Sequence, residues 1–172
     1  MKHSTIATLL LLLVAIRFNV AAQAAEPLLD SIPERPPAPA FELLGPDGTT
    51  HSLAALQGKP VIVNFWATWC PPCRAEMPSM QRAWEQLKDD GVLLIAINVG
   101  ESKADIDAFL ADVPVSFPLP MDETMGVSQA WPMKGLPTTF VVDPEGRLVY
   151  RAQGEREWDD PKLLDLVRAL RQ

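Results

Sequence analysis

The sequence predicts an α/β domain in which helices cover both faces of a mixed sheet. Two short apolar runs rich in β-branched residues, Val61 to Trp66 and Val92 to Val99, are typical of strands buried on both faces. Between them, residues 73–87 carry apolar side chains at helical spacing. A strand, a helix and a second strand in this order indicate parallel pairing of the two strands.

The second half of the chain adds a helix and a hairpin to this unit. Ser102 followed by Asp105 matches a capping box, which predicts a helix over 103–111. Residues 138–143 and 148–152 read as strands, and the Pro-Glu-Gly-Arg sequence between them is a tight turn. These two strands should therefore form an antiparallel hairpin.

Residues 1–24 have the pattern of a secretory signal peptide. Lys2 precedes an apolar run, and small residues follow, with a small-x-small cleavage motif at 22–24. Arg17 interrupts the run before it reaches the roughly 20 residues of a membrane-spanning helix. We therefore expect cleavage and a location in the periplasm or another extracytoplasmic compartment. The alternative is an uncleaved N-terminal segment that anchors the protein to a membrane.

The mature chain divides into a linker and one domain. Four prolines within residues 31–40 exclude a helix or a central strand, so we expect an extended linker over 25–40. The folded domain is expected over 41–172. It would begin with a short strand at 41–44 and end with an amphipathic helix at 161–171, where Leu and Val side chains share one face.

Composition and charge exclude some classes of function. The chain has 172 residues, of which 48% are hydrophobic, as is usual for a globular domain. It carries 22 acidic against 15 basic side chains and a net charge of −7. The charges are scattered rather than gathered into a tail, which indicates a solvated surface. Nucleic acid is therefore not an expected partner.

The only two cysteines, Cys70 and Cys73, follow a predicted buried strand and open a predicted helix. Residues three apart on a first helical turn are close enough to form a disulfide. The helix N-terminus favours a thiolate at Cys70, which makes it the expected nucleophile, with Cys73 as the resolving thiol. A disulfide that closes so short a loop contributes little to stability, which favours a redox role over a structural one.

Metal and haem readings of the same pair are weak. A structural zinc site needs four ligands, usually Cys or His. The mature chain has only the two cysteines and His51. Covalent haem attachment needs His directly after the second cysteine, where this chain has Arg74. We expect no metal and no cofactor.

Two motifs carry a resemblance to a known family, and they span about residues 41–170. Asn64-Phe65-Trp66-Ala67-Thr68-Trp69-Cys70-Pro71-Pro72-Cys73 and Gly135-Leu136-Pro137-Thr138-Thr139-Phe140 resemble the thioredoxin superfamily. More narrowly, the chain resembles the TlpA/ResA/DsbE-like branch of exported thiol–disulfide oxidoreductases. The resemblance implies a thioredoxin-like fold.

The resemblance also implies roles for individual residues. Pro137 would be cis and lie beside the cysteines, and with Leu136 and Trp69 it would contact the substrate. Cytosolic thioredoxins usually have a buried Asp at the position of Asn64, and Asn64 cannot transfer protons as that carboxylate does. Glu101 follows the next strand and is our candidate for tuning the cysteine pair or transferring its protons; the alternative is a glutamate that only stabilises a helix start.

The sequence also predicts where several tryptophan and methionine side chains lie. Trp66, Met77, Met80 and Met125 are expected in the core. Trp131 precedes the Pro137 loop and is expected to shape a substrate groove.

The leading functional expectation is reduction of disulfides in extracytoplasmic proteins, with apocytochrome c thiols as one implied substrate. Electrons would come from a membrane protein that transfers thiol reducing equivalents. The alternatives are an oxidase that donates its disulfide to folding proteins, and a non-redox thioredoxin-like binding module. A peroxidase is disfavoured, because the peroxiredoxin pattern requires Pro and Thr or Ser where this chain has Val63 and Ala67.

Overall fold

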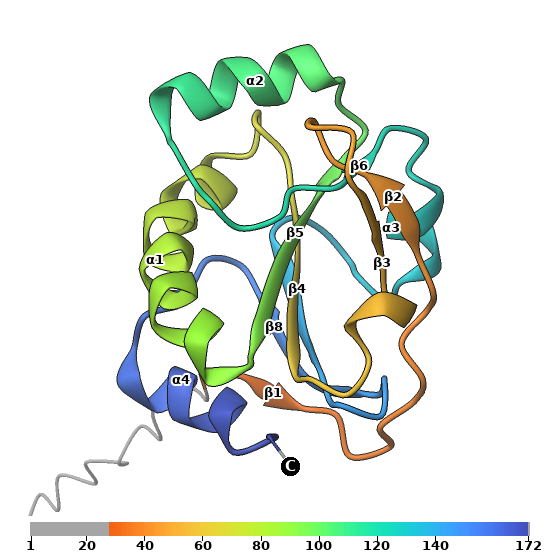
Figure 1. Cartoon of the computed structure of the whole chain (residues 1–172), viewed down its shortest axis with the longest axis vertical. Coiled ribbons are helices and arrows are strands. Elements are labelled where there is room, and N and C mark those ends of the chain that lie inside the picture. The colour runs from red at the N-terminus through yellow and green to blue at the C-terminus, as the bar shows by residue number, and fades with distance from the viewer. Residues whose placement is uncertain (1–27, 172) are drawn as a thin grey trace, which may run out of the picture.

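A computed structural model describes residues 28–171 and shows a six-stranded sheet packed between two layers (Figure 1). The strand order is β1-β8-β7-β4-β5-β6. The strands are β1 (Asp30–Ser31), β4 (Val61–Trp66), β5 (Leu93–Val99), β6 (Met121–Asp122), β7 (Thr138–Val142) and β8 (Leu148–Gln153). β4, β5 and β6 run parallel to one another, whereas β7, β8 and β1 are added by antiparallel pairing. The predicted mixed sheet is confirmed.

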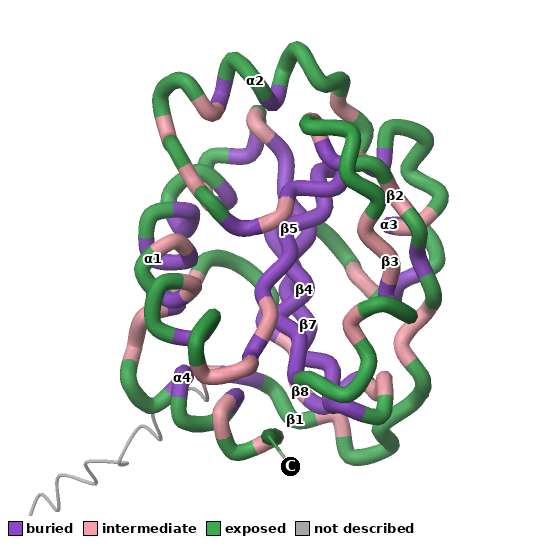
Figure 2. The backbone as a smooth tube through the Cα atoms, viewed as in Figure 1, coloured by how far each residue is buried: buried purple, intermediate pink, exposed green. Residues whose placement is uncertain are grey.

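β4 lies at the centre of this sheet and carries the chain to the first cysteine. All six of its residues are buried, because β5 and β7 pair with its two edges and helices or loops cover its two faces. Figure 2 shows this buried centre as a continuous column formed by β4, β5 and β7. The apolar, β-branched composition of β4 matches such a site.

The three longer helices pack their apolar side chains into one cluster on one face of the sheet. They are α1 (Pro71–Leu87), α2 (Lys103–Asp112) and α4 (Pro161–Arg168). The opposite face is covered by the hairpin of β2 (Glu42–Leu44) and β3 (Thr50–Ser52), by the 3-10 helix η1 (Ala54–Leu56) and by α3 (Gly126–Ala130). Helices thus lie on both faces, as predicted, but those on the second face are short. A second 3-10 helix, η2 (Lys88–Asp90), follows α1.

Two local predictions are confirmed in detail. The Ser102 side chain accepts a hydrogen bond from the backbone N–H of Asp105, and the Asp105 carboxylate accepts one from the backbone N–H of Ser102. This capping box begins α2 at Lys103. β7 and β8 form the predicted antiparallel hairpin, and Gly146 has a φ of 79° in the turn between them.

The expected linker differs from what the structure shows. Asp30–Ser31 forms β1 on β8, and the backbone N–H groups of Ile32 and Ala38 donate to the carbonyls of Val149 and Gly146. The Leu29 side chain is buried in the main core. The segment makes a turn at residues 32–35, where Arg35 has a φ of 43°, and its described part from residue 28 packs on the domain. The folded domain therefore begins before residue 41.

Two side-chain predictions are wrong. Met125 is 45% exposed; it is the N-cap residue of α3 and has a left-handed backbone conformation with φ of 60°. Trp131 is buried among the rings of Phe41, Phe65 and Phe140, so it belongs to the second core and does not line a groove. Trp66, by contrast, lies in the core as predicted.

The predicted signal peptide or anchor, residues 1–24, lies outside the described residues and stays a prediction. Among residues 28–171, no helix has the length and apolar character needed to cross a membrane.

Candidate active site

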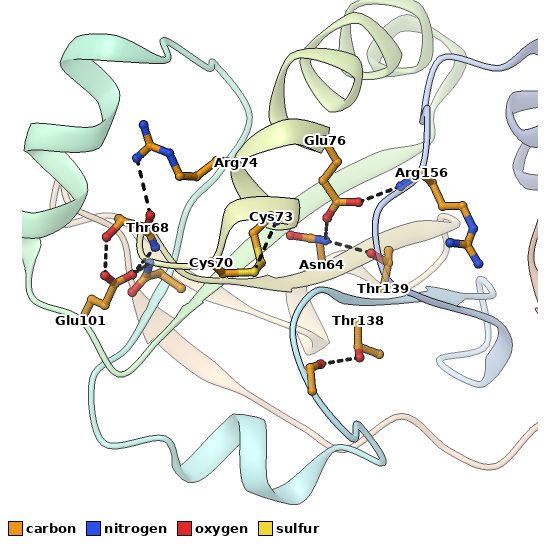
Figure 3. Close-up of a disulfide and its surroundings, with 12 residues drawn as sticks. Asn64, Thr68, Cys70, Cys73, Arg74, Glu76, Glu101, Thr138, Thr139 and Arg156 are labelled. Carbon is orange, nitrogen blue, oxygen red and sulfur yellow. Dashed lines mark hydrogen bonds between the residues drawn. A yellow bond between two sulfur atoms is a disulfide. The ribbon is translucent and has the colours of Figure 1, made fainter.

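Cys70 and Cys73 form a disulfide at the N-terminus of α1 (Figure 3). The Cα atoms are 5.3 Å apart. Cys70 is the N-cap residue, and its sulfur accepts a hydrogen bond from the backbone N–H of Cys73 at 3.3 Å. Pro71 and Pro72 fill the first helical positions, where a missing N–H leaves no partner unsatisfied. The local sequence therefore fixes where the helix starts and directs a backbone donor at the Cys70 sulfur.

The two cysteines are both buried, and Cys73 is slightly more so than Cys70. Cys70 is 3% exposed and Cys73 is fully buried. Trp69, directly before the pair, is 67% exposed, so a large aromatic surface lies beside the more accessible cysteine. The difference in burial is small, and what distinguishes Cys70 is the backbone donor at its sulfur together with its position beside Trp69.

The loop before β7 leads into the strand that pairs with β4, the strand that precedes Cys70. The Leu136–Pro137 peptide bond is cis, in agreement with the expectation, and Thr138 begins β7 opposite Phe65 of β4. The Thr138 hydroxyl donates to the carbonyl of Gly135 at 2.6 Å, which holds this turn. Residues 134–138 line a shallow cavity of about 190 Å³ together with residues 153 and 154.

Glu101 holds the loop that leads to Cys70. It follows β5 after Gly100 and is half-buried. Its carboxylate accepts hydrogen bonds from the backbone N–H of Thr68 at 2.7 Å, from the Thr68 hydroxyl at 2.5 Å and from Nδ2 of Asn98 at 2.7 Å. The structure thus brings the predicted residue to the active-site loop, where its direct partner is Thr68.

Arg74 supports the same loop from α1. Its guanidinium lies 5.1 Å from the centroid of the Phe109 ring of α2, within the range of a cation–π contact. Its Nη1 also donates to the Thr68 carbonyl at 3.5 Å. Arg74 therefore connects the active-site helix to α2.

Glu76 is a functional candidate that the sequence analysis missed. It is buried on the core face of α1, one turn after Cys73. Its Oε1 accepts from Asn64 Nδ2 at 2.8 Å, and its Oε2 accepts from Trp158 Nε1 at 2.9 Å and from the backbone N–H of Arg156 at 3.2 Å. Figure 3 shows the Asn64 side chain between the disulfide and Glu76.

Burial raises the pKa of the Glu76 carboxyl to about 7, and the nearby charge of Glu155 acts in the same direction. The hydrogen bonds from Trp158, Asn64 and Arg156 oppose this rise without cancelling it. A carboxyl that changes protonation near pH 7 can take up or release a proton during thiol chemistry. The available signal was the spacing: residues 73 and 76 lie three apart, on the same face of the helix.

Within the described part of the chain, no three His, Cys, Asp or Glu side chains are grouped so that they could hold a metal ion.

Comparison with known proteins assigns the fold and the site to a class. The AhpC/TSA family matches residues 35–151. A structure from Chlorobium tepidum that carries the provisional name thiol:disulfide interchange protein DsbE has a TM-score of 0.74 and 31% identity, and the match covers 84% of this chain and 99% of that one. The chain belongs to the AhpC/TSA family, and its fold is thioredoxin-like.

Sequence relatives narrow this class. The thiol–disulfide oxidoreductase ResA of Bacillus subtilis is 42% identical over 120 residues, which are 70% of this chain and 67% of the relative. ResA of Geobacillus thermodenitrificans is 37% identical over 125 residues, or 73% and 72% of the two chains. The protein is therefore a thiol–disulfide oxidoreductase that resembles the ResA proteins.

Proposed function

We propose that this protein reduces disulfides of proteins outside the cytoplasm through the Cys70–Cys73 dithiol. The observation that carries the proposal is the asymmetry of the pair. The Cys70 sulfur receives a backbone N–H at the start of α1, whereas Cys73 is fully buried one turn further on. A donor at the helix N-terminus stabilises a thiolate, so Cys70 attacks first and Cys73 resolves.

The reaction consists of two balanced exchanges. The Cys70 thiolate attacks one sulfur of a substrate disulfide; that S–S bond breaks, a mixed disulfide forms, and the departing substrate thiolate takes up a proton. The Cys73 thiol then loses its proton and attacks Cys70, which releases the second substrate thiol and closes the Cys70–Cys73 disulfide. Two electrons have passed to the substrate.

We propose that Glu76 accepts the proton that Cys73 loses. The two residues lie three apart on the buried face of α1, which places their Cβ atoms about 5–6 Å apart. A carboxyl whose pKa is raised to about 7 by burial is ionised in part at neutral pH and can serve as a base for a thiol. Glu101, bound to Thr68, would position the loop that carries Trp69 and Cys70.

Substrate contacts are proposed for Trp69, Leu136 and Pro137. Trp69 offers exposed aromatic surface beside Cys70. Leu136 and Pro137 line the shallow cavity before β7, where an extended substrate segment can pair with the backbone. We propose that these residues together contact the protein substrate near Cys70.

The partners follow from the direction of electron flow. A reductase outside the cytoplasm must be recharged, so we propose a membrane protein of the thiol-transferring type as electron donor. Apocytochrome c thiols are the proposed substrate class, on the strength of the resemblance to the ResA proteins. Location in the periplasm or a comparable compartment, with cleavage or retention of residues 1–24, is part of the same proposal.

The test is the equilibrium reduction potential of the Cys70–Cys73 pair, measured on protein without residues 1–24 in glutathione or dithiothreitol buffers. A value near or below that of thioredoxin, about −270 mV, supports a reductant. A value near −120 mV would reverse the direction and make the protein an oxidase of folding proteins. Unchanged function in Cys70→Ser and Cys73→Ser would instead favour a non-redox binding module.

A further inference from the structure

The side-chain amide of Asn64 makes hydrogen bonds through its nitrogen but not through its oxygen. Its side chain is fully buried on β4, and its Nδ2 donates both to Glu76 Oε1 and to the Thr139 hydroxyl, each at 2.8 Å. These two acceptors fix the orientation of the amide. Its Oδ1 has no donor within hydrogen-bonding distance among the described residues.

The free oxygen lies on the side of the disulfide. In Figure 3 the amide nitrogen of Asn64 is turned toward Glu76 and Thr139, and its oxygen is turned toward the Cys70–Cys73 bond. A disulfide has no hydrogen to donate, whereas a thiol is a weak donor. A buried acceptor without a partner is destabilising, so the site favours any state that supplies a donor.

We propose that Asn64 Oδ1 accepts a hydrogen bond from the Cys73 thiol in the reduced protein, which makes Asn64 a positioning residue that keeps Cys73 protonated. The inference rests on the proposed role of Cys73 as the resolving cysteine. A hydrogen bond that only the neutral thiol can donate opposes its ionisation. Cys70 has the reverse surroundings, because its sulfur faces a backbone donor.

The two sulfurs are thus distinguished by hydrogen-bond polarity as well as by burial. Cys70 meets a donor and is stabilised as a thiolate; Cys73 meets an acceptor and is stabilised as a thiol. The same Asn64 amide holds Glu76 through its nitrogen. One side chain therefore positions both the thiol that must later lose its proton and the carboxylate that receives it.

The direct test is the infrared S–H stretching band of a protein with Cys73 as its single thiol. Cys70→Ala removes the other cysteine, and this background is combined with Asn64→Ala, Asn64→Asp or Thr139→Val. A hydrogen-bonded S–H band lies at lower frequency than a free one. With Asn64 in place we expect the lower-frequency S–H band of a hydrogen-bonded thiol. Asn64→Ala should show the band of a free S–H. Asn64→Asp keeps an acceptor oxygen and should restore the lower-frequency band.

Thr139→Val is the matched control. It removes the other partner of the Asn64 nitrogen but leaves Oδ1 and Glu76 in place, so the low band should remain. An identical band with Asn64 and with Asn64→Ala overturns the proposal. A shift in Thr139→Val as large as that in Asn64→Ala also overturns it, because the band would then report packing alone.

The second readout uses both cysteines. Loss of a hydrogen bond made only by the dithiol should raise the equilibrium constant for disulfide formation about fivefold in Asn64→Ala, which corresponds to a potential about 20 mV more negative. An unchanged or less negative potential contradicts the proposal. Neither readout depends on the substrate or on the direction of electron flow, so the proposed function can fail while this inference stands.

Discussion

Glu76 and Glu101 lie on either side of the cysteine pair, and each is bound by an asparagine from a central strand. Asn64 of β4 donates to Glu76, and Asn98 of β5 donates to Glu101. Their other partners differ: Glu76 is enclosed by Trp158 and the Arg156 backbone, whereas Glu101 is half-buried and holds a loop.

The difference teaches that nearness to a cysteine does not by itself define a proton-transfer group. Burial raises the pKa of Glu76 to about 7, where its protonation can change during the reaction. Glu101 accepts three hydrogen bonds, two of them from Thr68. Burial and the raised pKa of Glu76 support the proposal of proton transfer for Glu76, and the contacts to Thr68 support loop positioning for Glu101. The following predictions test this division.

The largest effect should be on the pH dependence of stability in Glu76→Gln. The pKa of Glu76 rises from an ordinary value of 4.5 to about 7 on folding, so between these values the folded state binds the proton more tightly. The free energy of unfolding of the oxidised protein should therefore fall by about 3 kcal/mol as pH rises from 4.5 through 7. This decline should be absent in Glu76→Gln.

Urea unfolding between pH 4 and pH 9 measures this effect. Glu155→Gln is the control, because it removes a charge that raises the Glu76 pKa but leaves the carboxyl in place. It should move the decline to slightly lower pH without abolishing it. Parallel stability curves for the original protein and Glu76→Gln would show that Glu76 is not titrating in this range.

The next effect concerns the resolution step. Loss of a general base costs typically a hundredfold or more, so Glu76→Gln should slow resolution of a Cys70 mixed disulfide about 100-fold at pH 8. The inflection near pH 7 in the pH dependence of this rate should also disappear. Stopped-flow release of a chromophoric thiol from the mixed disulfide gives this rate. A slower rate with the inflection intact would mean that Glu76 supports structure only.

A smaller effect is expected for Glu101→Gln. Weaker contacts to Thr68 should misplace the loop before Cys70 and lower kcat/KM for a disulfide substrate about tenfold. The cysteine titration, followed by thiolate absorbance, should stay unchanged if Glu101 only positions the loop. A shifted titration would return Glu101 to the tuning role expected from the sequence.

The smallest effect is expected for Ser102→Ala. This change removes the N-cap of α2 directly after Glu101 and should cost about 1 kcal/mol in unfolding free energy. Activity per folded molecule should remain within twofold. A larger loss of activity would show that the Glu101 region responds to any local destabilisation. The effect of Glu101→Gln would then no longer indicate a specific role of Glu101 in positioning the loop.

Much of the fold follows from local patterns in the sequence. The buried strands at 61–66 and 93–99, the capping box of α2 and the hairpin of β7 and β8 all depend on residues close together in the chain. β6 and α3 were not predicted, since a strand of two residues and a helix of five carry too little periodicity.

The candidate site was predictable to the extent that a motif marks it. Cys70, Cys73 and Pro137 follow from their spacing and the family resemblance, and Glu101 was placed near them. Glu76 was missed because its environment depends on partners about 80 residues further along the chain. Burial among such partners, which one sequence does not show, converts an ordinary helix glutamate into a group that titrates near pH 7.

The pairing of residues 30–38 with β8 has a consequence for self-association. β8 would otherwise be an edge strand with unpaired N–H and C=O groups, which readily pair with another chain. β1, the Ile32 and Ala38 N–H groups, and the bond from Leu148 N–H to the Pro36 carbonyl cover this edge. Proteolytic removal of the residues before 41 would expose the edge of β8. The proline-rich segment is therefore expected to limit edge-to-edge association of the protein.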